Sequence, residues 1–355
     1  MMSDAFDEIW PNRDRLARII YEVQLGQLSG SLASRMRAYQ TKCIRDATHN
    51  LSHLAVASFF SSEKLFTSYV EWLKVLFEGL RRKRNGDYAK PQHNSLGQHF
   101  ELTLSVLEEE LSDKALESIN PFLARAINQT NNPVRMPPSE MPSNPYYRDV
   151  ASEYLSSLLN LEKGRAKDLI YDLHDNLDVL TIYDKILGPV LREVGRLWHI
   201  GELDVADEHF ITEFTKTFIL ELSLLEKNFT NKNQNKRAFM MAVGLEHHNV
   251  GLQMVKHMFD VGGWDTFMIG GNLPASYIVP KLKHVKPKAI AISTTIPTNL
   301  VETASLVRSI KKAKCNGTIV VGGYPYTLDT SLWRTIGADY YSPDAHQTLA
   351  YLNTA

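Results

Sequence analysis

The stretch RAFMMAVGLEHHNVG, residues 237–251, decides the fold of the C-terminal part of this 355-residue chain. It opens with a short, nearly continuous apolar run, which is typical of a strand buried on both faces of a parallel sheet. Downstream, apolar runs of the same kind recur at 264–271, 289–294 and 318–323, and helical patterns separate them. This alternation predicts a doubly wound, flavodoxin-like α/β domain with a parallel sheet over residues 237–355.

Three loops of this predicted domain are candidates for a ligand site, because ligands of such sheets bind at the carboxyl ends of the strands. They are LEHHNVG (245–251), ISTTIPTN (292–299) and VGGYPYT (321–327). The first loop combines an acid with imidazole, which is a good ligand for cobalt. Glycines in the first and third loops let the backbone approach a large flat molecule closely.

The three loops together resemble the motifs of cobalamin-binding domains, whose first loop has Asp or Glu, any residue, His, two residues and Gly. The matching residues are Glu246, His248 and Gly251 in the first loop, Ser293 and Thr295 in the second, and Gly322 and Gly323 in the third. The resemblance implies that His248 binds cobalt from below and that Glu246 supports its other ring nitrogen. The other residues would line a slot for the displaced base of the corrin. The alternative is a flavodoxin-like receiver with surface histidines, which leaves the glycine and Ser/Thr placements unexplained.

Upstream of this domain, the chain divides into two helical regions. NNPVRMPPSEMPSNPYY (131–147) is rich in prolines, which cannot continue a helix, so a linker is predicted over 131–148. Before it, apolar residues at helical spacing predict an all-helical domain over 1–130. After it, four amphipathic segments predict a four-helix bundle over 149–230, and the polar stretch 227–236 predicts a connector.

The predicted bundle contains the stretch GRLWHIGELDVADEHF (195–210). Its Trp198, with Glu208 and His209 further on, resembles the cap signature of adenosylcobalamin-dependent photoreceptors of the light-controlled carotenoid-repressor type. The resemblance implies that the bundle caps the upper face of the corrin and that these three side chains surround the adenosyl group. It also implies that His199 binds cobalt from above after light has broken the cobalt–carbon bond.

Each of these cap residues also has a plainer interpretation. A Trp on a bundle helix is usually part of the core, and a Glu-His pair at a helix start is usually a solvated first turn. Asp204 is a candidate cap for a helix that begins near Val205. The occurrence of the whole set beside a cobalamin motif favours the photoreceptor interpretation.

The N-terminal region departs from the repressors of that family, which carry a winged-helix DNA-binding domain. Residues 1–128 show no recognition-helix pattern, and the basic cluster 81–84 is confined to one stretch, so direct DNA binding is not expected. FTSYVEWLKVLFEGL (66–80) resembles the N-terminal region of a wider group of bacterial cobalamin-domain sensors. Some of that group, the photocobilins, hold a bilin with N-terminal helices, and a bilin such as biliverdin as a second chromophore is therefore a hypothesis for this chain. The residues predicted to line its pocket are Phe59, Phe60, Phe66, Tyr69, Trp72, His49, His53, His93 and His99. The default interpretation of these residues is that they are core side chains at helical spacing.

Composition and charge argue against several other classes. The formal net charge of −1 gives no bulk attraction to nucleic acid or to an anionic membrane. Cys43 and Cys315 lie far apart in the sequence, so neither a disulfide framework nor a thiolate zinc site is indicated. The N-terminus lacks the apolar run of a signal peptide, and no membrane span is indicated, so a cytoplasmic location is predicted.

The sequence therefore predicts a cobalamin-binding light sensor that is not an enzyme and that signals by self-association or through a protein partner. A corrinoid methyl carrier for methyltransferases is the alternative, because its lower domain has the same motifs. A redox or haem sensor of the related antirepressor type is disfavoured, since the lower-ligand motif with His248 is kept. A mutase is not expected, because no barrel-sized catalytic domain is indicated.

Overall fold

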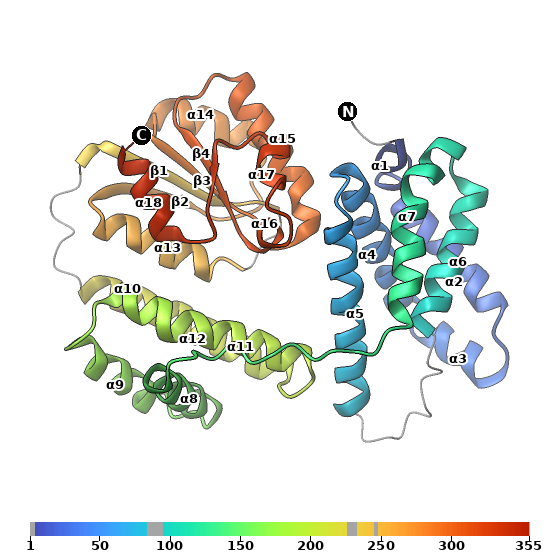
Figure 1. Ribbon diagram of the computed structural model, residues 1–355, viewed down its shortest axis with the longest axis horizontal. Coiled ribbons are helices and arrows are strands. Elements are labelled where there is room, and N and C mark those ends of the chain that lie inside the picture. Colours follow the sequence, from blue (N-terminus) through green and yellow to red (C-terminus); the bar gives the residue numbers. More distant parts are fainter. Residues whose placement is uncertain (1–3, 84–94, 226–232, 245–247, 355) are drawn as a thin grey trace.

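The computed structural model describes residues 4–83, 95–225, 233–244 and 248–354. Two helical bodies and one α/β body lie side by side (Figure 1). This architecture confirms the predicted fold class. In the part of the chain that the structure describes, no helix is both long and apolar enough to cross a membrane.

The N-terminal body consists of helices whose apolar faces meet in one core. Leu51, Phe66 and Phe100 are almost completely buried in it. The side chain of Ser112 accepts a hydrogen bond from the amide of Ala115 and so caps the last helix of this body. The helices are α1 (Asp4–Ile9), α2 (Arg13–Gly26), α3 (Gly30–Ala38), α4 (Gln40–Phe59), α5 (Glu63–Lys83), α6 (Ser95–Glu110) and α7 (Asp113–Thr130).

Residues 131–144 connect the two helical bodies without forming a helix or a strand. The next helix, α8 (Pro145–Leu159), begins inside the stretch that was predicted as linker. Pro145 is compatible with this start, because a proline in the first turn loses no helical hydrogen bond. Asn144 caps the helix by accepting a hydrogen bond from the amide of Tyr146.

The second helical body, called the cap below, contains the four predicted segments. They are α8, α9 (Lys163–His174), a long third segment and α12 (Val205–Leu225). The third segment comprises α10 (Val179–Ile182), a π-helix η1 (Tyr183–Leu187) and α11 (Gly188–His199). The sequence did not predict the π-helix, which is a local widening common at functional sites.

The α/β body has a five-stranded parallel sheet in the order β2-β1-β3-β4-β5. This order is that of flavodoxin-like folds, in which strand order reverses beside β1. The strands are β1 (Asn233–Ala242), β2 (Trp264–Ile269), β3 (Ala289–Ser293), β4 (Thr318–Gly322) and β5 (Tyr340–Tyr341). The helices are α13 (Val250–Val261), α14 (Ala275–Val285), η2 (Pro297–Asn299), α15 (Leu300–Lys312), α16 (Tyr324–Leu328), α17 (Leu332–Ile336) and α18 (Ala345–Thr354).

Two strand features differ from the prediction. Strand β1 starts at Asn233, inside the stretch predicted as a polar connector, because its first residues pair with β2 across an irregularity before Arg237. The short β5 was not predicted, because two tyrosines give no apolar run. Neither difference moves the carboxyl ends of the long strands.

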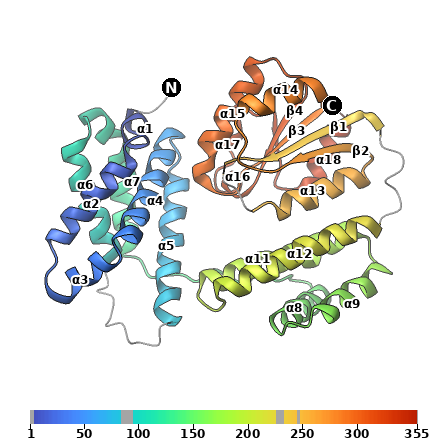
Figure 2. The ribbon, with the colours of Figure 1, turned by 180° about the vertical axis from the view of Figure 1, so that it is seen from behind.

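Contacts between the three bodies fix their arrangement. The cap packs on α13, whose Val250 belongs to the apolar cluster of the cap. Helix α5 of the N-terminal body contacts both α11 of the cap and α16 of the α/β body, as the two opposite views agree (Figures 1 and 2). The carboxyl edge of the sheet therefore has the cap on one side and α5 on another.

Candidate functional site

The predicted ligand loops leave the sheet at one edge. Ser293, the last residue of β3, pairs with Ala242 at the end of β1 and with Gly322 at the end of β4. The three carboxyl ends are therefore level at this edge of the sheet. His248 follows β1 and is exposed two residues before α13 begins. Glu246, its predicted support, lies outside the described residues.

The loops after β3 and β4 are in close contact. Gly323 has φ +116°, and a Cβ on it would lie 1.9 Å from the carbonyl oxygen of Thr294. Only glycine fits at such a position. The amide of Thr294 also donates to the carbonyl oxygen of Gly322 at 2.9 Å. Thr294 is completely buried, whereas Ser293 and Thr295 on either side of it are partly exposed.

Two other predicted glycines lie beside open space. A Cβ built on Gly251 or on Gly322 has no atom within 4 Å. Small residues with room beside them, next to an exposed His248, suit a site where backbone approaches a broad flat ligand. The donor set fits a corrinoid, because cobalt in a corrin needs one protein ligand and imidazole is suitable.

The cap brings its predicted residues to one turn. Trp198 and His199 end α11, and Glu208 and His209 lie in the first turn of α12. Nδ1 of His209 lies 2.6 Å from Oε2 of Glu208, and the side chain of His209 is 72% exposed. The other carboxylate oxygen of Glu208 accepts from the hydroxyl of Thr212 at 3.0 Å.

The start of α12 also contains the cap that the plainer interpretation requires. The carboxylate of Asp204 accepts a hydrogen bond from the amide of Asp207 at 2.9 Å. Hydrogen bonds from this first turn lower the pKa of Asp204. Asp204 therefore caps the start of α12, and the cap does not need Glu208 or His209.

Trp198 and His199 face a residue of another body that the sequence did not place here. Nε2 of His199 lies 2.8 Å from the main-chain carbonyl oxygen of Trp72 on α5. A carbonyl only accepts, so this nitrogen carries the proton. The rings of Trp72 and His199 are stacked, with centroids 5.0 Å apart and planes at 17°. The ring centroids of Trp72 and Trp198 lie 6.4 Å apart. Burial lowers the pKa of His199, and the carbonyl partly opposes that shift.

A second contact positions the cap on the sheet. The hydroxyl of Tyr183, in the π-helix, lies 2.8 Å from Nδ1 of His257 on α13. It also donates to the carbonyl oxygen of Ile219 on α12 at 3.2 Å. Burial lowers the pKa of His257 to about 4, so its ring is neutral at physiological pH. Sequence reasoning missed this pair, because nothing local links a cap tyrosine to a histidine of α13.

The residues predicted to line a bilin pocket fall into different surroundings. His53 stacks on Tyr69 with ring centroids 3.7 Å apart, and the Tyr69 hydroxyl donates to Asn50 at 2.7 Å. The amide of Asn50 lies 3.0 Å from Nε2 of His99. Burial lowers the pKa of His53 to about 3 and that of His99 to about 4. Phe66 is buried, Trp72 faces the cap, and His93 lies outside the described residues.

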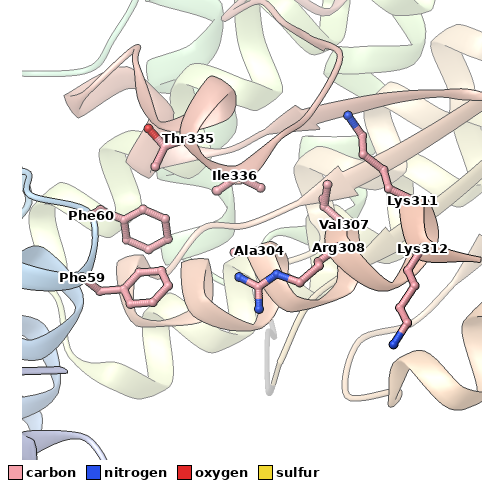
Figure 3. A pocket seen from close by; sticks show the side chains of 9 residues that line it. All are labelled: Phe59, Phe60, Ala304, Val307, Arg308, Lys311, Lys312, Thr335 and Ile336. Carbon is pink, nitrogen blue, oxygen red and sulfur yellow. The ribbon is translucent and has the colours of Figure 1, made fainter. Parts of the chain in front are cut away.

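A cavity of about 620 Å³ lies where the N-terminal body meets the α/β body (Figure 3). It is lined by Phe59, Phe60, Ala304, Val307, Arg308, Lys311, Lys312, Thr335 and Ile336. Two of the predicted bilin-lining residues, Phe59 and Phe60, thus line an interdomain cavity. None of its lining residues belongs to the predicted cobalamin motifs.

Comparison with known proteins agrees with the geometry of the carboxyl edge. One model of a B12 binding domain matches residues 236–350, and a second matches residues 150–222. The chain is 26% identical over 212 residues to the trimethylamine corrinoid protein of Methanosarcina barkeri, which covers 54% of this chain and 95% of that protein. It is 20% identical over 182 residues to the HTH-type transcriptional repressor CarH of Myxococcus xanthus, which covers 51% of this chain and 60% of CarH.

The fold is also that of a solved corrinoid protein. The monomethylamine corrinoid protein of Methanosarcina barkeri matches 59% of this chain and 99% of its own chain, with a TM-score of 0.51 and 16% identity. The two regions matched by the B12-binding models lie in the cap and in the α/β body. The chain therefore contains a pair of B12-binding domains and has homologues among the corrinoid proteins.

Proposed function

We propose that this chain is a cobalamin-dependent light sensor without catalytic turnover of its own. Adenosylcobalamin supplies a cobalt–carbon bond that visible light breaks. His248 would bind its cobalt from below, with Glu246 beside it, and the residues after β3 and β4 would hold the nucleotide tail. The observation that carries the proposal is the placement of Trp198 near the end of α11 and of Glu208 and His209 near the start of α12, on either side of one short turn.

The chemistry of that turn suits an adenosyl group. The indole of Trp198 is a flat apolar surface that is only partly buried, so it has area left to cover a nucleoside. Glu208 accepts one hydrogen bond from Thr212 and pairs with His209, and carboxylate oxygens also accept from ribose hydroxyls. His199, on the same turn, is the residue that would take the upper position on cobalt after light.

A corrinoid methyl carrier is the second candidate. It is favoured by the higher identity to the trimethylamine corrinoid protein, 26% against 20% for CarH. Such a carrier would present a small methyl group to a partner methyltransferase. It would have no use for a nucleoside-sized wall at Trp198, and this difference separates the two candidates.

The two candidates differ in cofactor preference in the dark. A light sensor binds adenosylcobalamin at least as tightly as methylcobalamin, because the turn between α11 and α12 contributes contacts to the adenosyl group. Titration of the purified chain with each form, followed by tryptophan fluorescence, measures both dissociation constants. Poor binding of adenosylcobalamin together with tight binding of methylcobalamin would overturn the sensor and support the carrier.

The N-terminal body is proposed to add a bilin, such as biliverdin, as a second chromophore. The support is the partly exposed ring pair His53 and His99 among aromatic helices, both neutral at physiological pH. Protein purified from biliverdin-producing cells would then show a red absorption band that is absent from protein made without biliverdin. A chain that has no such band carries these rings as core side chains.

The output of the sensor is proposed to be altered self-association or binding of a protein partner in the cytoplasm. Cys43 and Cys315 are both free thiols, which suits a reducing compartment. Size-exclusion chromatography of the loaded chain in the dark and after light tests the self-association. An unchanged elution volume, with no partner retained in either state, would contradict this output.

A further inference from the structure

Helix α5 contacts both halves of the predicted cobalamin site along one face. The hydroxyl of Ser68 lies 3.3 Å from the hydroxyl of Tyr324, the first residue of α16 after β4. Four residues further on, Trp72 contacts the cap at His199, and seven residues beyond that Gly79 contacts the cap again. Positions with this spacing lie on one side of a helix. The face of α5 defined by Ser68, Trp72 and Gly79 is called the clasp face below.

At its far end the clasp face is in backbone contact with the cap. A Cβ on Gly79 would lie 2.6 Å from the carbonyl carbon of Ile200, and one on Gly201 would lie 2.6 Å from the carbonyl oxygen of Gly79. Gly201 also has φ +80°. Two glycines are needed for so close an approach. The turn that follows Trp198 and His199 is therefore seated directly on α5.

At its other end, the α5 region is fixed to the loop region after β4. Just before α5, the hydroxyl of Ser62 donates to the carboxylate of Asp329 at 2.6 Å. Burial raises the pKa of Asp329, but hydrogen bonds from Ser62 and Ser331 together outweigh it and hold this pKa below its ordinary value. The N-terminal body thus contacts the segments that follow β4 through Ser62 and Ser68, and it contacts the cap through Trp72 and Gly79.

Trp72 is the central residue of this arrangement. Its ring stacks on Tyr69 inside the N-terminal body, with planes at 12°, and on His199 of the cap, with planes at 17°. The residue nevertheless remains 39% exposed, next to the two cap residues assigned to the upper face of the cofactor. An aromatic ring in such a place covers a ligand and orients its neighbours at the same time.

We propose that the N-terminal body is a third wall of the cobalamin site, in which Trp72 is a positioning residue for Trp198 and His199. In a first step, cobalamin bound between the sheet and the cap would restrict the motion of α5. In a second step, departure of His199 from the Trp72 carbonyl would weaken the contact between the clasp face and the cap. The proposal rests on the proposed function only for this second step. The first step requires cobalamin binding alone.

The test uses the full chain in the dark, with hydroxocobalamin as the probe. Trp72→Ala is expected to weaken its binding roughly tenfold, as truncation of a central Trp commonly does. Trp72→Phe, which keeps a stacking ring, is expected to restore most of the affinity. Phe77→Ala is the matched control, because Phe77 lies on the same helix and is 50% exposed. Wild-type affinity in Trp72→Ala would overturn the proposal.

Two further measurements distinguish a positioning role of Trp72 from a general contribution to the stability of the fold, and the first of them needs no variant. Amide hydrogen exchange across residues 66–80 of the wild type is expected to slow when methylcobalamin binds in the dark, because its methyl group keeps His199 from the cobalt. Trp72→Ala is further expected to change the ratio of adenosylcobalamin to hydroxocobalamin affinity, which a uniformly loosened fold would leave constant. Unchanged exchange in α5 on binding would overturn the third wall. Because neither measurement uses light, absence of a light response in the wild type would overturn only the sensor.

Discussion

Nε2 of His199 in the cap donates a hydrogen bond to the carbonyl oxygen of Trp72, 2.8 Å away in the N-terminal body. The residue proposed to bind cobalt after light is therefore held in the dark by a helix of another body. For Nε2 to become a ligand it must lose this proton and this acceptor. Loss of this contact when His199 binds cobalt would release the cap from α5, and the cap would then be a two-state element of the kind that a switch requires.

His248 is the proposed lower ligand of cobalt, so its removal tests the cobalamin site most directly. His248→Ala is expected to leave a weakly bound cofactor that keeps its own base on cobalt, because the variant lacks the proposed lower ligand. The absorption spectrum of the loaded variant reports the lower ligand, and titration reports the affinity. His284→Ala, another exposed histidine of the α/β body, is the control and should behave like the wild type. Normal lower ligation in His248→Ala would remove that residue from the site.

Trp198 is expected to set the preference for the adenosyl form. Trp198→Ala removes a flat apolar wall, so the ratio of adenosylcobalamin to methylcobalamin affinity should fall roughly tenfold. Trp333→Ala offers a matched control, since Trp333 lies on α17 against the guanidinium of Arg334. A ratio that stays constant in Trp198→Ala would mean that this Trp serves only the packing of the cap.

The adjacent glycines after β4 should respond differently to the same substitution. Gly323→Ala places a Cβ 1.9 Å from the Thr294 carbonyl oxygen at positive φ, so it should lower the free energy of unfolding by about 1–3 kcal/mol or more. Gly322→Ala meets no atom within 4 Å and should change stability by less than about 1 kcal/mol. If a ligand approaches the backbone here, Gly322→Ala should still lose cobalamin affinity. Urea unfolding and titration together measure both effects, and intact affinity in Gly322→Ala would argue against that approach.

The N-terminal body should be sensitive to acid. The pKa values of His53, about 3, and His99, about 4, lie below the ordinary value of 6.5, so the unfolded chain binds protons first. The stability due to the neutral rings is complete above pH 6.5 and is lost as the pH falls toward 4. The slope should be on the order of 1 kcal/mol per pH unit for each ring. Urea unfolding at pH 7 and pH 5 measures it, and His53→Phe should reduce the slope. Equal stability at both pH values would show that folding does not lower the pKa values of these two histidines.

The sequence predicted the α/β body well because its signals are local. Runs such as AFMMAV and AIAIS are continuous apolar strands, and the ligand loops follow from their ends. Helical spacing likewise placed the four cap segments. What the sequence did not reveal is non-local: the contact of Trp72 with His199 joins residues 127 positions apart, and the Tyr183–His257 bond depends on how two bodies dock.

The same limit applies to the aromatic residues of the N-terminal body. Helical periodicity assigns Phe59, Phe66 and Trp72 equally to a core or to a pocket, because both present apolar rings at the same spacing. Their separate surroundings, an interdomain cavity, a buried core and the clasp face, depend on the packing of distant helices. The π-helix at Tyr183–Leu187 has no sequence signature of its own either.

The central claim is that light changes the upper ligand of a cobalamin held between the cap and the sheet. The most direct measurement is the absorption spectrum of the chain loaded with adenosylcobalamin in the dark, recorded before and after green light, for the wild type and for His199→Ala. In air, where dioxygen oxidises the cobalt(II) left by homolysis of the cobalt–carbon bond, the account predicts a rapid shift in the wild type to a stable cobalt(III) spectrum with imidazole on both faces, and a different final spectrum in His199→Ala. No shift in the wild type, or the same final spectrum in both proteins, would contradict it.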